Sequence, residues 1–186
     1  MPLAGVIKVQ PGKAANSSER KSMDGIGPEL LGRLLDEHGD ALALYARGWC
    51  DSPEDVVQEA LVQLMRQPHP PERIVPWLYR VVRNGAISAS RAAGRRRRHE
   101  TFAADREETW FVAASGERLD AATATQALKE LPEDERETIV ARLWGGLTFE
   151  EIAELTGASS STAHRRYEAG LKRLRERLGV EWIKTT

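Results

Sequence analysis

The sequence predicts an all-α protein of two small helical domains joined by an acidic linker, with a helix-turn-helix in the C-terminal domain. Apolar residues recur at helical spacing through most of the chain, and no segment shows the alternation of a β-strand. Residues that favour helix starts and stops bound several of these runs. At 186 residues, with 41% hydrophobic side chains, the chain suits one domain or two small ones with buried cores.

The N-terminal part of the chain divides into a tail and a first helical domain. Residues 1–23 are rich in Gly, Ser, Lys and Pro and show no periodicity, which predicts a disordered tail. The first domain is expected at residues 24–99. Its first helix begins at Pro28 with leucines along one side, and Gly39 is expected to interrupt it before a second apolar run that ends at Trp49.

Two further helices are predicted in this domain. In SPEDVVQEALVQLM, Ser52 is placed as the N-cap, Pro53 occupies the first helical position, and Asp55 stands where a capping box needs a carboxylate. The proline-rich segment QPHPPERIVP predicts a loop. Helical spacing returns in WLYRVVRNGAISASRAAG, where Leu78 and Val82 are expected to face inward.

An acidic linker and a second helical domain complete the chain. Residues 100–120 have weak periodicity and carry six acidic residues against two arginines, which predicts a linker with some helical character. The second domain is expected at residues 121–186. It begins with the helices ATQALKEL and PEDERETIVARLWGG, and the glycine pair at the end of the latter stops the helix.

The segment LTFEEIAELTGASSSTAHRRYEAGLKRLRERL predicts the helix-turn-helix. Thr148 and Glu151 form a capping-box pattern, Gly157 permits a tight turn, and Ser159 or Ser160 caps the next helix. In this motif the start of the second helix enters a DNA major groove, where side chains reach base edges and phosphates. Hydroxyl, imidazole and guanidinium groups suit such contacts. The candidates for DNA contact are Ser160, Ser161, Thr162, His164, Arg165 and Arg166.

Charge is segregated along the chain, although the formal net charge is only −1. Seven arginines and no acidic residue lie between Arg80 and Arg98, and six Lys/Arg against two Glu lie between His164 and Arg177. A solvated helix face usually mixes charges of both signs, so two such basic segments indicate two surfaces that meet an anion. The arginine run 95–98 is a phosphate-binding candidate, with a solvated basic turn as the alternative.

Composition excludes several classes of function. Cys50 is the only cysteine, which excludes an internal disulfide and a cysteine-based zinc cluster, and the four histidines have no ligand spacing. No apolar run approaches the roughly 18 residues of a membrane-spanning helix, and the N-terminal residues show no apolar core of a secretory signal. No nucleophile–base pair or phosphate loop is visible. We therefore expect a cytoplasmic protein that uses no cofactor or metal and is not an enzyme.

The chain resembles a known family in three segments. LPEDERETIVARLWGGLTFEEIAELTGASSSTAHRRYEAGLKRLRERL resembles the DNA-binding domain of bacterial sigma factors of the sigma-70 class. SPEDVVQEALVQLM resembles the sigma helix that docks on the polymerase clamp, and WLYRVVRNGAISASR resembles the helix that opens the promoter. Over about residues 25–180 the order of these segments resembles the two-domain extracytoplasmic-function group.

The resemblance implies a sigma factor that binds core RNA polymerase, reads the −35 promoter element as duplex DNA, and melts and holds the −10 element. The residues it assigns to polymerase contact are Asp55, Gln58 and Glu59. Those expected at the −10 element are Trp77, Arg80, Arg83, Asn84, Arg95 and Arg96. Helix capping is the alternative for Asp55, solvation for Glu59 and core packing for Trp77. The implied partners are core RNA polymerase and promoter DNA, and an anti-sigma protein is a further candidate.

Two other classes of function are compatible with parts of the sequence. LuxR-type regulators carry a similar helix-turn-helix, so a regulator that acts without replacing sigma is the closest alternative. A helical module that sequesters an acidic partner on its basic surfaces is the third. Binding to core polymerase distinguishes a sigma factor from the regulator, and promoter-specific transcription in a purified system distinguishes it from the sequestering module.

Overall fold

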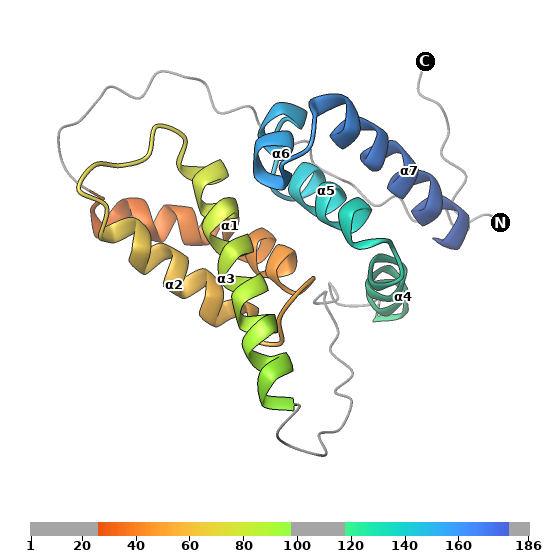
Figure 1. Ribbon diagram of the computed structural model, residues 1–186, viewed down its shortest axis with the longest axis horizontal. Helices are drawn as coiled ribbons and strands as arrows, with labels where there is room; N and C mark the ends of the chain where they lie inside the picture. Colours follow the sequence, from red (N-terminus) through yellow and green to blue (C-terminus); the bar gives the residue numbers. More distant parts are fainter. Residues whose placement is uncertain (1–25, 98–117, 179–186) are drawn as a thin grey trace.

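The computed structural model describes residues 26–97 and 118–178. These two ranges contain seven α-helices and the loops between them (Figure 1). The helices are α1 (Pro28–Ala46), α2 (Pro53–Met65), α3 (Ile74–Arg97), α4 (Arg118–Lys129), α5 (Glu133–Leu143), α6 (Phe149–Thr156) and α7 (Ser160–Leu178). Neither described range contains a strand, and the all-α prediction is confirmed. None of these helices has the length and apolarity to cross a membrane. The predicted tail lies outside the described residues.

Helices α1, α2 and α3 pack against one another in pairs. Their apolar sides meet in a core where Leu42, Leu64, Leu78 and Val82 are at most 1% exposed. Removal of such side chains from water is the main contribution that stabilises a small helical group. The inward positions predicted for Leu78 and Val82 are confirmed.

Two local expectations for this group were wrong. Helix α1 continues through Gly39, which is buried where a Cβ would approach Leu35 Cδ1 to 2.9 Å. A glycine inside a helix costs about 1 kcal/mol relative to alanine, and the burial of almost every residue in the second half of α1 outweighs that cost. Ser52 stands at the N-cap of α2 but makes no capping hydrogen bond, because its ψ of 64° is not the extended backbone from which a hydroxyl reaches the first turn.

Helices α4 to α7 form a second group, in which α7 packs against α4, α5 and α6. Ile139, Ile152 and Ala163 are fully buried in it. Gly170 permits the close approach of α7 to α5, because a Cβ at that position would lie 2.5 Å from Ile139 Cδ1. Helix α4 begins at Arg118, so the last residues of the predicted linker are helical, while residues 98–117 lie outside the described part.

The two helical groups are in direct contact. Helix α5 lies against α1, and α6 lies against α3 (Figure 1). Tyr45 of α1 and Tyr79 of α3 are buried, and their rings meet edge to face with centroids 4.9 Å apart. Buried side chains of both groups belong to one continuous cluster. The groups therefore share a packed surface as well as the chain that connects them.

Candidate nucleic-acid and polymerase interface

The helix-turn-helix forms as predicted from local signals. Thr148 and Glu151 make a reciprocal capping box, with Glu151 N–H donating to Thr148 Oγ1 at 3.2 Å and Thr148 N–H donating to Glu151 Oε2 at 2.6 Å. Gly157 ends α6 at φ 69°, a left-handed conformation that glycine adopts without steric cost. These two signals set the start and the end of α6, and the chain then turns directly into α7.

Hydroxyl groups organise the first turn of α7. Ser159 Oγ accepts from Thr162 N–H at 3.1 Å and lies 3.0 Å from Ser161 Oγ, so Ser159 is the cap. Ser160 donates its hydroxyl hydrogen to Glu150 Oε1 at 2.9 Å. Hydrogen bonding to the backbone, followed by this bond from Ser160, lowers the pKa of Glu150, so the carboxylate is ionised beside the helix start. Among the three serines, Ser160 is held by a protein carboxylate, and Ser161 is exposed.

His164 is exposed on one side and packed on the other. Its ring meets Phe149 edge to face at a centroid distance of 4.9 Å, and its Nδ1 lies 3.6 Å from Glu168 Oε2. Phe149 is also covered by the guanidinium of Arg142, whose carbon lies 4.8 Å from the ring centroid. The aromatic contact between α6 and α7 therefore sets the direction in which His164 projects.

The adjacent arginines of α7 have different surroundings. Arg166 Nε lies 2.9 Å from Asp134 Oδ2 of α5, and its side chain is 29% exposed. Arg165 is exposed, and no ion pair links it to another residue of the described ranges. Successive helix residues point about 100° apart, so one of two neighbours faces α5 while the other faces outward. Of the two predicted guanidinium contacts, the one at Arg165 is available to a ligand.

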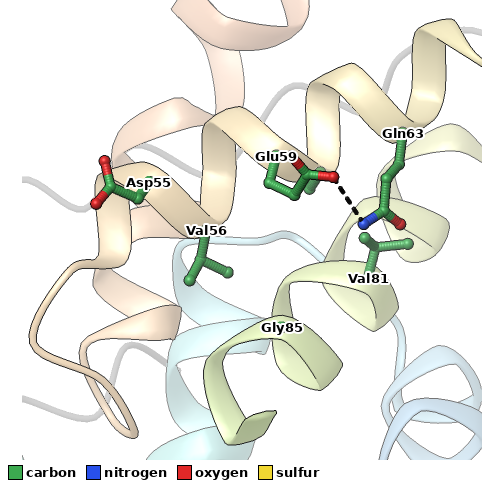
Figure 2. A pocket seen from close by; sticks show the side chains of 7 residues that line it. Asp55, Val56, Glu59, Gln63, Val81 and Gly85 are labelled. Atoms are coloured by element: carbon green, nitrogen blue, oxygen red, sulfur yellow. Dashed lines mark hydrogen bonds between the residues drawn. The ribbon is translucent and has the colours of Figure 1, made fainter. Parts of the chain in front are cut away.

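The predicted polymerase contacts lie on the outer side of α2. Asp55, Gln58 and Glu59 are all exposed. Asp55 and Glu59 line a groove between α2 and α3 that has a volume of about 190 Å³. Figure 2 shows both side chains on α2, with Val81 and Gly85 on the neighbouring α3. Gly85 forms part of the groove floor, where a Cβ would lie 3.0 Å from Val56 Cγ1. Ligand pockets occupy about 300–1,000 Å³, so this groove has room for a side chain of another protein rather than a drug-sized molecule.

The residues predicted at the −10 element follow α3. Trp77 is half-buried and packs on the core, which is the alternative to DNA contact that the sequence left open for it. Arg80, Asn84 and Arg95 are exposed, with Asn84 about one turn after Arg80 and Arg95 about three turns further along the helix. The side chain of Arg96 lies outside the described residues. Arg91, which was not among the predicted residues, is exposed as well, so α3 presents at least three guanidinium groups and an amide to solvent along its described length.

Two arginines of α3 are paired across the contact between the two groups, Arg80 with Glu154 at 4.0 Å and, more closely, Arg83 with Glu137. Of the two, Arg83 has the more enclosed surroundings. Its Nε donates to Glu137 Oε1 of α5 at 2.6 Å, and Tyr45 donates its hydroxyl hydrogen to the same oxygen at 2.6 Å. Burial opposes ionisation of Arg83, but the hydrogen bond and charge of Glu137 outweigh it and raise the pKa of Arg83. Burial, followed by the charge of Glu137, holds the pKa of Tyr45 well above its usual value. The cluster is therefore a carboxylate held by a guanidinium and a neutral phenol.

Comparisons with known proteins decide between the families that the motifs allow. A model of Sigma-70 region 2 matches residues 34–96, and a model of Sigma-70, region 4 matches residues 122–174. RNA polymerase sigma factor CarQ of Myxococcus xanthus is 35% identical over 133 residues, which cover 68% of this chain and 74% of CarQ. The chain belongs to the sigma-70 family of RNA polymerase sigma factors.

Other relatives agree with this family and with its extracytoplasmic-function group. RNA polymerase sigma factor SigV of Bacillus subtilis is 30% identical, over 70% of this sigma factor and 78% of SigV. ECF RNA polymerase sigma factor EcfG of Rhodopseudomonas palustris is 26% identical, over 76% of the present chain and 79% of EcfG. The sigma factor RpoE from Bartonella quintana, solved in complex with the anti-sigma factor NepR, superposes with a TM-score of 0.70 and 25% identity, over 84% of this chain and 100% of RpoE.

The match to region 2 decides against a LuxR-type regulator. A helix-turn-helix alone is common to both classes, but the match at residues 34–96 covers α2 and most of α3, the segments that resemble the clamp-binding and promoter-opening helices. The chain is therefore a sigma factor of the extracytoplasmic-function group, which directs RNA polymerase to promoters. Its region 4 holds the helix-turn-helix, and its region 2 holds the candidate residues of α2 and α3.

Sequence analysis missed the residues that join region 2 to region 4 in this sigma factor. Glu137 is 5% exposed, and its partners lie 54 and 92 positions away in the sequence. One local signal was present, because Glu137 shares a helix face with Ala141, which is fully buried. That signal indicates that Glu137 points inward and does not indicate which residues meet it.

Proposed function

We propose that this sigma factor divides promoter recognition between its two regions, with α7 reading the −35 element in the major groove and α3 contacting the −10 element. The observation that carries the proposal is the match of one chain to both region 2 and region 4, together with a helix-turn-helix whose second helix begins at the surface. The factor is not itself catalytic, and it acts in the cytoplasm as a subunit of the polymerase holoenzyme.

In region 4 the DNA-facing residues share the exposed side of the first turns of α7. Arg165 carries the strongest contact, because its guanidinium is exposed and can reach a guanine edge or a phosphate. Ser161, Thr162 and His164 contribute shorter-range hydrogen bonds. Ser160 and Arg166 act mainly by positioning α7, since each is held by a carboxylate of region 4.

In region 2 the two functions use different helices. Asp55, Gln58 and Glu59 of α2 contact core polymerase, and the groove beside them receives a polymerase side chain. The −10 element is contacted by residues along α3, in which arginines hold the backbone while bases are displaced onto the protein. These residues are Arg80, Arg83, Asn84, Arg95 and Arg96. Trp77 acts through the core rather than on DNA.

An anti-sigma protein is proposed as a further partner. The structure of RpoE contains the anti-sigma factor NepR, and the structure of CnrH, with a TM-score of 0.56 and 22% identity, contains the cytosolic domain of CnrY. These partners belong to those proteins. A protein of the anti-sigma class that binds between or across the two regions would hold this sigma factor inactive.

Run-off transcription with purified core polymerase and genomic fragments tests the proposal. The chain added to core enzyme should produce discrete transcripts that core enzyme alone does not. The variant Arg165→Ala should reduce them, whereas Lys172→Ala, an exposed change further along α7, should not. A requirement for a second sigma factor would instead support a regulator, and an absence of specific transcripts under all conditions would refute the proposal.

A further inference from the structure

The first residue of α7 is hydrogen-bonded to the first turn of α6. Ser160 begins α7, and Glu150 is the second residue of α6. The bond runs across the helix-turn-helix, from Ser160 Oγ to Glu150 Oε1 at 2.9 Å. An ionised carboxylate only accepts, so the hydroxyl of Ser160 is the donor. The contact that positions α7 therefore also fixes the direction in which the hydroxyl of Ser160 points its hydrogen.

The surroundings of Glu150 keep its carboxylate ionised. Hydrogen bonding to the backbone lowers its pKa most, the bond from Ser160 comes second, and Thr148 and Arg142 act in the same direction. Glu150 also lies in the first turn of α6, where the peptide dipoles favour a negative charge. The carboxylate is therefore charged at neutral pH and serves Ser160 only as an acceptor.

The oxygen of Ser160 remains able to accept. A serine hydroxyl has one hydrogen and two lone pairs, and the bond to Glu150 uses the hydrogen. Ser160 is partly exposed, and its printed partner within residues 118–178 is the Glu150 carboxylate alone. A free serine reads either a donor or an acceptor on a base edge. Ser160 in this arrangement offers DNA an acceptor.

The neighbouring hydroxyls are not fixed in this way. Ser159 Oγ lies 3.0 Å from Ser161 Oγ and 2.8 Å from Thr162 Oγ1. Each of these groups is a hydroxyl that donates or accepts, so their hydrogens can rearrange when a base or a phosphate approaches. Within residues 159–162, Ser160 is therefore the hydroxyl whose direction is set by a charged partner.

The chemistry of the major groove gives this direction a consequence. Residues at the start of a recognition helix meet base edges there. The amino groups of cytosine and adenine donate, whereas O6 and N7 of guanine and O4 of thymine accept. Ser160 is therefore matched to an amino group, and an acceptor facing it is left without a partner, which is unfavourable. The exposed charge of Glu150 disfavours a phosphate at the same place, because like charges repel.

We propose that Glu150 is a positioning residue that makes Ser160 a hydrogen-bond acceptor, so that one base pair of the −35 element must present the amino group of cytosine or adenine to the start of α7. The proposal rests on the reading of the −35 element by α7 given above. Glu150 acts through Ser160 and does not itself touch a base. Without the fixed acceptor, Ser160 regains both hydrogen-bonding roles and the preference at that base pair relaxes.

Transcription by the holoenzyme from a promoter library tests this. The library carries a promoter identified by run-off transcription, with every base pair of its −35 element randomised and the transcripts counted by sequencing. Glu150→Gln keeps the side-chain size and places an amide, which donates or accepts, beside Ser160. Ser160→Ala removes the hydroxyl. We expect the unmodified holoenzyme to prefer cytosine or adenine at one position, and each variant to reduce that preference about fivefold without changing the others.

Two further variants show whether Glu150 acts through the hydroxyl. The double variant Glu150→Gln/Ser160→Ala should be as selective as Ser160→Ala alone. Glu176→Gln makes the same charge change at an exposed site of α7 and should alter no preference. An even gain over all −35 sequences for Glu150→Gln would show that Glu150 only repels phosphate. A further loss of selectivity in the double variant would show that Glu150 contacts a base directly. Either result would overturn the proposal.

Arg165→Ala separates this proposal from the one on which it rests. It should lower transcription if α7 binds the −35 element, either evenly or at a base pair other than the one read by Ser160. If it does so while Glu150→Gln and Ser160→Ala leave every preference unchanged, reading by α7 stands and the role of Glu150 is refuted. If all three variants transcribe the library like the unmodified protein, both proposals are wrong.

Discussion

The different surroundings of Arg165 and Arg166 lead to opposite expectations for two adjacent substitutions. Arg165→Ala removes an exposed guanidinium that no described residue holds in an ion pair, so the fold should keep its stability. Arg166→Ala removes the partner of Asp134 at 2.9 Å, in a pair whose side chains are 29% and 48% exposed. The first change should therefore weaken DNA binding, and the second should mainly weaken the packing of α7 on α5.

The magnitudes follow from the kind of contact that each arginine makes. If Arg165 reads a guanine with two hydrogen bonds, its loss should cost about 1–3 kcal/mol of binding free energy and relax specificity at one base pair. If it holds a phosphate, affinity should fall evenly across sequences, and the salt slope should decrease by about one unit. For Arg166, a partly exposed pair contributes about 0.5 kcal/mol to the free energy of unfolding, after screening by solvent.

Two measurements on the full chain test this contrast. Fluorescence anisotropy with a −35 duplex at several salt concentrations gives the binding free energy and the salt slope. Urea unfolding gives stability, and a double-mutant cycle of Arg166→Ala with Asp134→Ala isolates their pair. Lys172→Ala, at a side chain 77% exposed on the same helix, is the matched control for loss of one positive charge. The reasoning is refuted if Arg166→Ala weakens DNA binding as much as Arg165→Ala while its stability is unchanged.

Three further expectations concern other parts of the chain. The double variant Gln58→Ala/Glu59→Ala should reduce co-purification with core polymerase and leave the circular dichroism spectrum unchanged. The control Gln67→Ala, just beyond α2, should not reduce co-purification, and equal recovery of core polymerase with all variants would contradict the assignment. The pKa of Tyr45 is raised by burial and then by Glu137. The contribution of Tyr45 to the free energy of unfolding should therefore be constant below about pH 10 and fall above it, because the unfolded chain releases the phenol proton first. Tyr45→Phe should lessen that alkaline fall in urea midpoints, and an identical pH profile would show that the phenol is not buried as described. Deletion of about eight residues within 103–116, in the predicted linker, should strongly reduce transcription from the natural promoter. An extended chain spans roughly 3.3 Å per residue, so the shortened linker would no longer let the two regions reach both promoter elements, and promoters with shorter spacers should be affected least. Full activity on the natural promoter would show that the segment is not a tether.

Local signals predicted the helix-turn-helix because each acts within a few residues. The capping box of Thr148 and Glu151 satisfies free backbone donors at the start of α6, and Gly157 supplies the left-handed residue at its end. Neither depends on the rest of the chain. Gly39 shows where local reasoning failed, since the helix continues through it only because the surrounding residues of α1 are buried by other helices.

The candidate site was predictable in outline and not in detail. Residue types and spacing predicted the start of α7 as a DNA-contacting surface, and Ser161 and Arg165 are exposed there, while their contact with DNA stays a prediction. The sequence does not distinguish Arg165 from Arg166, because both occupy the same short basic stretch. The position of Asp134 on α5 distinguishes them, and that position follows from how α5 packs on α7.

Apolar periodicity, caps and turn glycines act over short separations, so the helices and their order follow from the sequence, and the resemblance of three segments indicated the family. The enclosure of Glu137 by Arg83 and Tyr45, and the packing of region 4 on region 2, appear only in the folded chain. The free energy of a buried charge depends on which groups surround it in space. Those groups lie 54 and 92 residues away along the chain, beyond the reach of any local pattern.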